Sequence, residues 1–140
     1  MEALGRLHEA SILVARERQA PLYARYGLQQ GEFDALATLR RSGAPEGLTP
    51  TALFEAAMMS SGGMTARIDR LEKAGLVARG PHPTDRRATL VRLTDKGFDL
   101  IETVMPHHEE AARDILAPLS LDEQKTLNAL LARLIGGFCD

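Results

Sequence analysis

The sequence has one cysteine and no tryptophan among its 140 residues. Because Cys139 has no second cysteine in the chain to pair with, no intrachain disulfide can stabilise the fold. We expect Cys139 to be an inert residue of the C-terminal tail. The alternative is a thiol that senses oxidants or links two subunits.

Long apolar runs are also missing. The sequence has no stretch of about 18 apolar residues and no charged segment followed by an apolar leader. It therefore predicts neither a membrane span nor a signal peptide, and we expect a cytoplasmic protein. The length predicts one domain, or one domain with appended helices.

Motifs for catalysis and for tight metal binding are absent. No nucleophile stands near a histidine and acid pair, and Gly62-Gly63 lacks the lysine and the preceding strand of a phosphate-binding loop. We therefore expect neither an enzyme nor a cofactor. His107 and His108, with Glu110 and Asp114, offer too few donors on one helix face to close a zinc site. An exposed polar face is predicted there, and a metal-responsive regulator is the alternative.

Charge is distributed unevenly along the chain. The whole chain has a net charge of −2, with 17 lysine and arginine residues against 19 aspartate and glutamate residues. Residues 61–92 nevertheless hold seven basic and three acidic side chains, so this segment has a net charge of +4 and the remainder has −6. A basic patch on an acidic body favours binding of a polyanion through one local surface.

Residues 60–75 have the pattern of a helix with one buried and one exposed face. Ser60 and Ser61 can cap its start, and Gly75 can end it. The predicted buried stripe is Met64, Ile68 and Leu71. The predicted exposed face is small at its start and basic further along, and it consists of Gly62, Gly63, Ala66, Asp69, Arg70 and Lys73, flanked by Thr65 and Arg67.

Two short apolar runs around a proline-containing turn predict a β-hairpin. The runs are residues 76–79 and 90–93, and in the second we expect Val91 and Leu93 to face inward. The two prolines of the connection limit its freedom. We therefore expect Arg86 and Arg87 to project from the tip.

The segments on either side of this unit also carry helix signals. Upstream, Thr49 as a cap and Pro50 at the first helical position predict a short helix over residues 50–55. Downstream, Thr94 stands where the N-cap of another helix belongs. Helix, turn, second helix and hairpin is the order of a winged helix-turn-helix. The predicted fold is therefore mainly α with a small β-hairpin wing.

The outer segments are predicted to be helices with apolar stripes. The stripes are Leu4, Leu7, Ser11 and Val14 near the N-terminus, then Phe98, Ile101 and Met105, and after a capping box at Ser120 and Glu123 the residues Leu127, Leu130, Leu131, Leu134 and Phe138. One small domain cannot cover this much apolar surface. We expect a homodimer; the alternative is a monomer that satisfies every stripe internally.

Three parts of the sequence together resemble the MarR family of bacterial transcriptional regulators. They are the run from Ile68 to Val77, the Asp85-x-Arg87 pair, and the segment Val91-x-Leu93-Thr94-x-x-Gly97. The resemblance implies a homodimer that places recognition helices in major grooves and wings in adjacent minor grooves, with DNA affinity often tuned by a small molecule. Residues 28–94 would then bind DNA, and residues 1–27 and 95–140 would form the dimerisation region.

The predicted DNA contacts follow from this arrangement. Ser60 and Ser61 would bind phosphate through their hydroxyls and the free amides of the helix. The residues expected to face base edges are Gly63, Thr65 and Ala66, with Arg67 or Arg70 reaching a guanine or the backbone. In the wing, Arg87 and Arg86 would enter the minor groove. Asp85 is expected to pair with an arginine and fix the wing.

A finer resemblance concerns a ligand. Asp34, with Arg67 and Arg79, is similar in placement to residues that the urate-responsive branch of the family uses to bind an anion and to relay its presence to the DNA helix. That branch also uses a tryptophan in its N-terminal helix, which this chain lacks. We therefore expect a small organic anion or a phenolic compound. The alternative is that Asp34 forms a structural ion pair with Arg67 or Arg79.

Two functions remain open at this stage. The favoured one is a ligand-responsive, sequence-specific regulator, acting as a repressor on a pseudo-palindromic operator. The other is a winged-helix dimer that serves as a protein-interaction module without specific DNA binding, which the small residues Gly62, Gly63 and Ala66 leave open.

Overall fold

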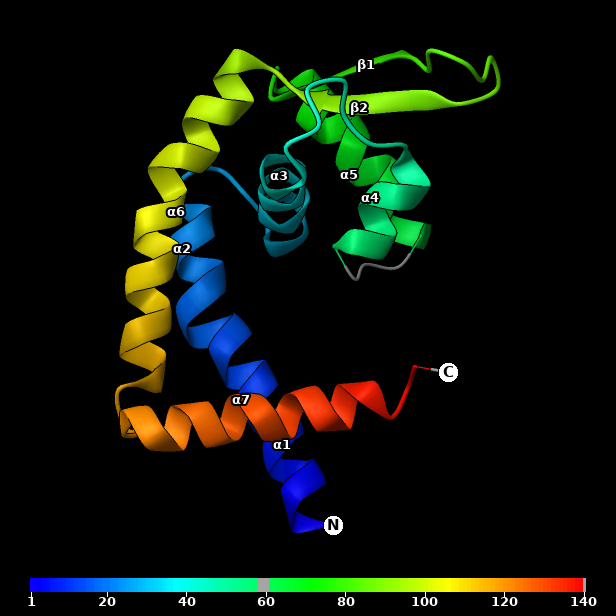
Figure 1. The fold of residues 1–140 in the computed structure, drawn as a ribbon. Helices are drawn as coiled ribbons and strands as arrows, with labels where there is room; N and C mark the ends of the chain where they lie inside the picture. The colour runs from blue at the N-terminus through cyan, green and yellow to red at the C-terminus, as the bar shows by residue number, and fades with distance from the viewer. Residues whose placement is uncertain (58–60, 140) are drawn as a thin grey trace.

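A computed structural model describes residues 1–57 and 61–139. In chain order the elements are α1 (Glu2–Leu13), a π-helical segment η1 (Val14–Gln19), α2 (Ala20–Ala24), α3 (Gln30–Ser42), α4 (Pro50–Ala56), α5 (Ser61–Lys73), β1 (Val77–Pro81), β2 (Thr89–Leu93), α6 (Asp95–Leu116) and α7 (Leu121–Gly136). The prediction of a mainly helical fold with one small hairpin is confirmed (Figure 1).

Three predicted helix starts are present with their capping side chains. The Thr49 hydroxyl accepts a hydrogen bond from the first turn of α4 at 3.1 Å, and Thr94 does the same for α6 at 3.1 Å. At the start of α7, Ser120 and Glu123 each accept a hydrogen bond from the other's backbone amide, at 3.1 and 2.8 Å. These bonds satisfy amides that have no partner within the helix, so short polar sequence signals set where each helix begins.

Helix α6 runs along the molecule and links its two ends (Figure 1). At one end, α3, α4 and α5 lie beneath the hairpin, and at the other end α7 follows the turn after α6 and passes in front of α1 in this view. The core lies between the winged unit, which is α3, α4, α5 and the hairpin, and the half of α6 next to it. Its most deeply buried residues include Leu36, Leu53, Ile68, Leu71, Val77, Val91, Ile101 and Val104. This core supports the surface from which the hairpin projects.

The hairpin pairs Val77 with Leu93 at its base and Pro81 with Thr89 near its tip, in antiparallel register. The loop before α4 adds to its edge, because Leu48 exchanges two backbone hydrogen bonds with Val91 at 2.9 and 2.7 Å. The inward-facing pair expected on β2 was partly wrong. Val91 is buried, but Leu93 is only half-buried and Leu90 is buried as well. Leu90 lies on a hollow that Leu48, Thr49 and Ala52 also line, whereas Leu93 borders another one with Leu39 and Phe98.

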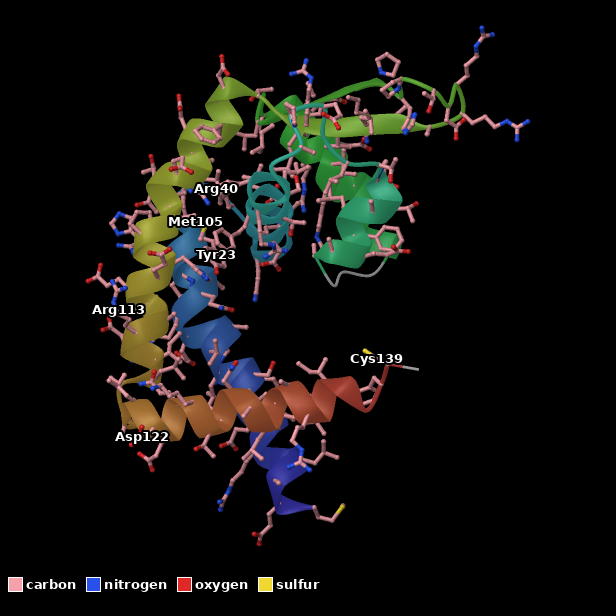
Figure 2. The ribbon with its side chains drawn as sticks, in the orientation of Figure 1. Tyr23, Arg40, Met105, Arg113, Asp122 and Cys139 are labelled. Atoms are coloured by element: carbon pink, nitrogen blue, oxygen red, sulfur yellow. The ribbon has the colours of Figure 1, made fainter. Side chains whose placement is uncertain are left out.

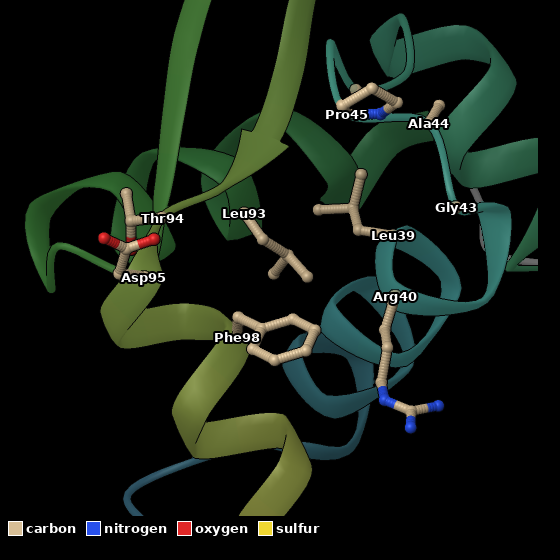
Figure 3. Close-up of a pocket in the computed structure, with 10 residues that line it drawn as sticks. Leu39, Arg40, Gly43, Ala44, Pro45, Leu93, Thr94, Asp95 and Phe98 are labelled. Atoms are coloured by element: carbon tan, nitrogen blue, oxygen red, sulfur yellow. The ribbon is translucent and has the colours of Figure 1, made fainter.

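The buried stripe of α6 also differs from the prediction. It consists of Gly97, Ile101 and Val104, whereas Phe98 is 48% exposed. Gly97 lies so close to the Leu76 carbonyl that a Cβ atom would overlap it, and this close approach rotates Phe98 outward. Phe98 instead lines a cavity of about 280 Å³ with Leu39 and Leu93 (Figure 3).

The N-terminal segment and α7 bury little of their apolar surface within the chain. Residues 2–24 are helical almost throughout, but the predicted helix over residues 4–18 passes into the π-helical segment at Val14. Neither α1 nor α7 contains a buried residue. Within residues 1–57 and 61–139, every helix is too short or too polar to span a bilayer.

Candidate nucleic-acid interface

Helix α5 presents the two faces that its sequence predicts. Met64, Ile68 and Leu71 are buried, each with at most 2% of its surface exposed, and they fix the helix on the core. Thr65 and Ala66 lie on the exposed side, and Gly63 is half-buried. Ser61 is the first residue of α5, while Ser60 lies outside the described residues. The exposed side has small side chains, which would let the backbone of α5 approach a partner closely.

The two arginines of α5 turn toward α3. The Arg67 side chain lies between Gly31 and Gly63, so closely that a Cβ atom added to Gly31 would overlap its guanidinium group. Arg70 donates a hydrogen bond to Gln29 Oε1 at 2.5 Å and lies 4.0 Å from Glu32. Both side chains therefore link the candidate recognition helix to the start of α3. In this position half of the Arg70 side chain stays exposed, whereas Arg67 is only partly exposed.

The wing arginines lie at the tip of the hairpin connection. Arg86 and Arg87 are exposed, and no carboxylate in the described part of the chain comes within 4.0 Å of either guanidinium group. Asp85 was expected to pair with an arginine side chain, but its carboxylate accepts a hydrogen bond from the Arg87 backbone amide at 2.9 Å. Because this carboxylate bonds the backbone and neither guanidinium group, both positive charges remain available to a partner.

Arg79 ties the base of the wing to α5. Its guanidinium donates to Asp69 at 2.7 Å and to Glu72 at 2.9 Å, and the hydrogen bond to Asp69 raises the pKa of the already cationic group. Arg79 is thus engaged by α5 and does not meet Asp34, with which the sequence analysis had grouped it. The pairing fixes the angle between the wing and the candidate recognition helix.

Asp34 faces a cavity of about 340 Å³ between α3, the end of α4 and α6. The residues that line it are Phe33, Asp34, Ala37, Thr38, Arg41, Ala56, Ala57, Met105 and His108. Burial raises the pKa of the Asp34 carboxyl, although the charges of His108 and Arg67 oppose this shift. Among the described residues no cation lies within 4.0 Å of the carboxylate, so the alternative of a structural ion pair with Arg67 or Arg79 is wrong.

A cluster of aromatic rings closes one side of this cavity. The Tyr23 hydroxyl and His108 Nδ1 share a hydrogen bond of 2.9 Å, and Phe33 stacks on Tyr23 with ring centroids 4.2 Å apart. Burial, with a smaller contribution from the charge of Asp34, raises the pKa of the Tyr23 hydroxyl. Tyr23 and Met105 lie where α2 and α6 run side by side (Figure 2). The cavity therefore combines an apolar wall with a carboxyl group and an imidazole, which suits a small polar aromatic molecule.

The raised pKa of Asp34 predicts a measurable cost in stability. The folded chain holds the Asp34 proton more tightly than the unfolded chain, so the free energy of unfolding falls as pH rises from about 4 through the folded-state pKa. Asp34→Asn keeps the shape and removes the charge. Its melting temperature at pH 7 should exceed that of the wild type by a few degrees, and the gap should close near pH 3, as thermal unfolding at both pH values can measure. A less stable variant at pH 7 would contradict this assignment.

Sequence reasoning missed several residues that shape these sites. Tyr23 and His108 are 85 positions apart, and only the packing of α2 against α6 brings them together. Gln29, which precedes α3, accepts a hydrogen bond from Arg70 of α5. His107 and His108 diverge, since His107 stacks on Tyr26. Among the described residues, no three histidine, cysteine, aspartate or glutamate side chains are grouped as a metal site.

Comparison with known proteins places this geometry in a family. A sequence profile described as "MarR family" matches residues 26–88. The HTH-type transcriptional regulator PecS of Dickeya dadantii is 43% identical over 134 residues, which are 96% of this chain and 80% of that protein. The regulator MhqR of Bacillus subtilis is 30% identical over 79% of this chain and 74% of its own length. These relatives are named as regulators and not as enzymes.

Solved structures agree over nearly the whole chain. A mutant MarR from E. coli complexed with operator DNA superposes with a TM-score of 0.84 at 28% identity, covering 94% of this chain and 93% of that one. A MarR family regulator from Streptomyces coelicolor in complex with DNA superposes with a TM-score of 0.88 at 25% identity, covering 99% and 88%. Sequence and fold thus give the same assignment. This chain belongs to the MarR family and is a DNA-binding transcriptional regulator of the winged helix-turn-helix type.

Proposed function

We propose that this regulator acts as a homodimeric repressor that releases its operator when a small organic anion or phenolic compound binds. One observation carries the DNA-binding part of the proposal. The wing arginines stand exposed and without carboxylate partners at 4.0 Å in the described part of the chain, beside a recognition helix with a small exposed face. A regulator with bacterial relatives works on the chromosome, so we place it in the cytoplasm.

The proposed contacts divide by what each element can reach. Thr65, Ala66 and Gly63 would lie in the major groove, where Ala66 can contact a thymine methyl group. Arg87 and Arg86 would enter the minor groove, whose potential is most negative where A·T pairs narrow it. Ser60 and Ser61 are proposed to contact phosphates at the start of α5. Arg67 or Arg70 is proposed to reach a guanine or the DNA backbone, and Arg70 is the more exposed of the two.

The proposed dimer rests on apolar side chains that the single chain leaves uncovered. On α7, Leu130 is 53% and Leu134 is 49% exposed, and on α1, Leu4 is 67% exposed. Burying these side chains against a second copy removes them from water, which is the dominant favourable term in association. We therefore propose residues 1–27 and 95–140 as the dimerisation region and residues 28–94 as the DNA-binding region.

The proposed ligand site is the cavity beside Asp34. A ligand there would contact α3 and α6, and the Arg67 side chain links α3 to the recognition helix at Gly31 and Gly63. A shift of α3 against α5 would thus reach the DNA-binding surface by direct contact. The Asp34 carboxyl favours a ligand that donates a hydrogen bond to it, such as a phenol. Arg41, which lines the same cavity, could pair with the charge of an organic anion.

Salt dependence tests the proposed function against the protein-interaction alternative. We expect a duplex from the gene's own upstream region to bind more tightly than a random duplex, with log affinity falling steeply against log salt. The half-sites should lie about one helical turn (~34 Å) apart. Equal affinity for both duplexes at every salt concentration would favour a winged-helix dimer that binds proteins and not specific DNA.

A further inference from the structure

His82 forms several hydrogen bonds with the turn at the tip of the wing. His82 follows the last residue of β1, and its backbone amide still continues the hairpin ladder with a bond of 3.3 Å to the Ala88 carbonyl. Its Nδ1 atom accepts hydrogen bonds from the backbone amides of Thr84, at 3.2 Å, and Asp85, at 3.1 Å. The Thr84 hydroxyl lies 3.4 Å from the same nitrogen. Two backbone amides and one hydroxyl of the turn thus converge on one ring atom.

The bonds of the turn continue from this ring atom to the arginines. Asp85, held by its amide, uses its carboxylate to accept from the Arg87 amide at 2.9 Å and its carbonyl to accept from the Ala88 amide at 3.2 Å. The imidazole of His82 therefore holds Asp85, and Asp85 holds the backbone amides of Arg87 and Ala88. Since backbone amides can only donate, Nδ1 must carry a lone pair and the ring proton must lie on Nε2.

We propose that His82 is a positioning residue of the DNA-binding wing, whose Nδ1 atom holds the turn so that Arg86 and Arg87 are presented in a fixed direction. This inference rests on the proposed function, because the direction of the arginines matters only if they enter DNA. A wing ordered before binding loses less conformational entropy on binding, and this raises affinity without adding a contact. The arginines keep their charges whether or not the turn is ordered.

Three substitutions separate this role from a direct contact between the ring and DNA. Asn places its amide oxygen near the position of Nδ1 and can accept from the amide two residues later, as in an Asx turn. Gln reaches further and mimics the outer Nε2 atom, but it cannot supply an acceptor near the ring base. Ala supplies neither atom. If His82 positions the turn, the Gln variant should bind the operator as weakly as the Ala variant. If the ring contacts DNA directly, the Gln variant should bind like the wild type.

The test measures the free protein first. In wild type and His82→Asn, the ¹⁵N order parameters of residues 84–87 should stay near those of rigid backbone, about 0.85, and in His82→Ala and His82→Gln they should fall toward about 0.6. Operator affinity should fall roughly fivefold in the Ala and Gln variants and stay within about twofold in the Asn variant. The slope of log affinity against log salt should be the same in all four proteins, because no phosphate contact is removed.

Each arm can overturn the inference. Unchanged order parameters in His82→Ala would show that the ring does not hold the turn. Lower order parameters with wild-type affinity would show that wing order does not serve binding, and wild-type affinity in His82→Gln alone would indicate a direct contact by the outer ring atom. If the wild type itself fails to distinguish operator from random duplex, the proposed function falls as well, whereas the first two outcomes leave it intact.

Discussion

Replacing both Arg86 and Arg87 with alanine is expected to lower operator affinity by roughly tenfold per arginine at physiological salt and to reduce the salt slope by about 1 to 2. The reason is that both side chains are exposed at the wing tip, with no carboxylate of the described residues within 4.0 Å to neutralise them. Their charges are thus free to replace counterions in a narrow groove. Fluorescence anisotropy with an operator duplex at several salt concentrations measures both quantities.

The matched control removes two positive charges elsewhere. Arg113 on α6 and Lys125 on α7 are exposed. Arg113 (Figure 2) and helix α7 (Figure 1) lie toward the end of the molecule opposite the hairpin. Arg113→Ala with Lys125→Ala changes the net charge by the same amount, so it should alter affinity by less than about twofold at physiological salt because screening limits distant charges. An equal loss of affinity in the two double variants would mean that overall charge, and not the wing, governs binding.

Introducing carboxylates at Leu130 and Leu134 is expected to produce monomers that no longer bind the operator. Leu130→Glu with Leu134→Glu places two charges on the exposed apolar face of α7, where dimerisation would bury them at a cost of several kcal/mol each. Without the dimer, each chain binds one half-site independently. The affinity gained by linking two DNA-binding units is then lost, which is on the order of a hundredfold or more. Sedimentation equilibrium at micromolar protein and an operator titration measure the two effects.

The single chain should survive this substitution. No residue of α7 is buried, and the core lies between the winged unit and α6, so the circular dichroism spectrum and most of the melting transition should persist. Lys125→Glu, on the opposite side of α7, introduces a carboxylate as a control and should remain dimeric. A Leu130→Glu, Leu134→Glu protein that stays dimeric, or a monomer with wild-type operator affinity, would contradict the proposed role of this face.

Local signals in the sequence were enough to predict where three helices begin and which face of α5 is buried. Thr49, Thr94 and Ser120 cap helices through bonds that span three residues, so their effect is readable without knowledge of the fold. The stripe of Met64, Ile68 and Leu71 likewise follows from helical period alone and is buried as predicted.

Features that depend on distant partners were not predictable in this way. Gly97, and not Phe98, belongs to the buried face of α6, because the Leu76 carbonyl approaches α6 too closely for a side chain at this position. The π-helical segment at Val14–Gln19 has no local sequence signal, and it ends at Gln19, which accepts a hydrogen bond from Gln30 of α3 at 2.8 Å. Tertiary packing decides both features.

The candidate sites divide along the same line. The wing arginines were identified because a turn with two prolines projects its charges whatever lies beneath it. Helical period alone could not show that the arginines of α5 also contact the start of α3, where Arg70 donates to Gln29 and Arg67 lies against Gly31. Asp34 was selected through the family resemblance, but its neighbour His108 comes from a helix more than 70 residues away in the sequence. Ligand cavities built by several helices are therefore the part of such proteins that sequence reasoning predicts least.

Hydroxyl-radical footprinting on the operator tests the central claim most directly, namely that two copies present paired wings to one face of a duplex. We predict a two-fold symmetric pattern with protected half-sites about one helical turn (~34 Å) apart, produced by two chains per duplex, with the wing-dependent protection lost in the Arg86→Ala, Arg87→Ala protein. A single asymmetric footprint from one chain, or wing-independent protection, would contradict the account.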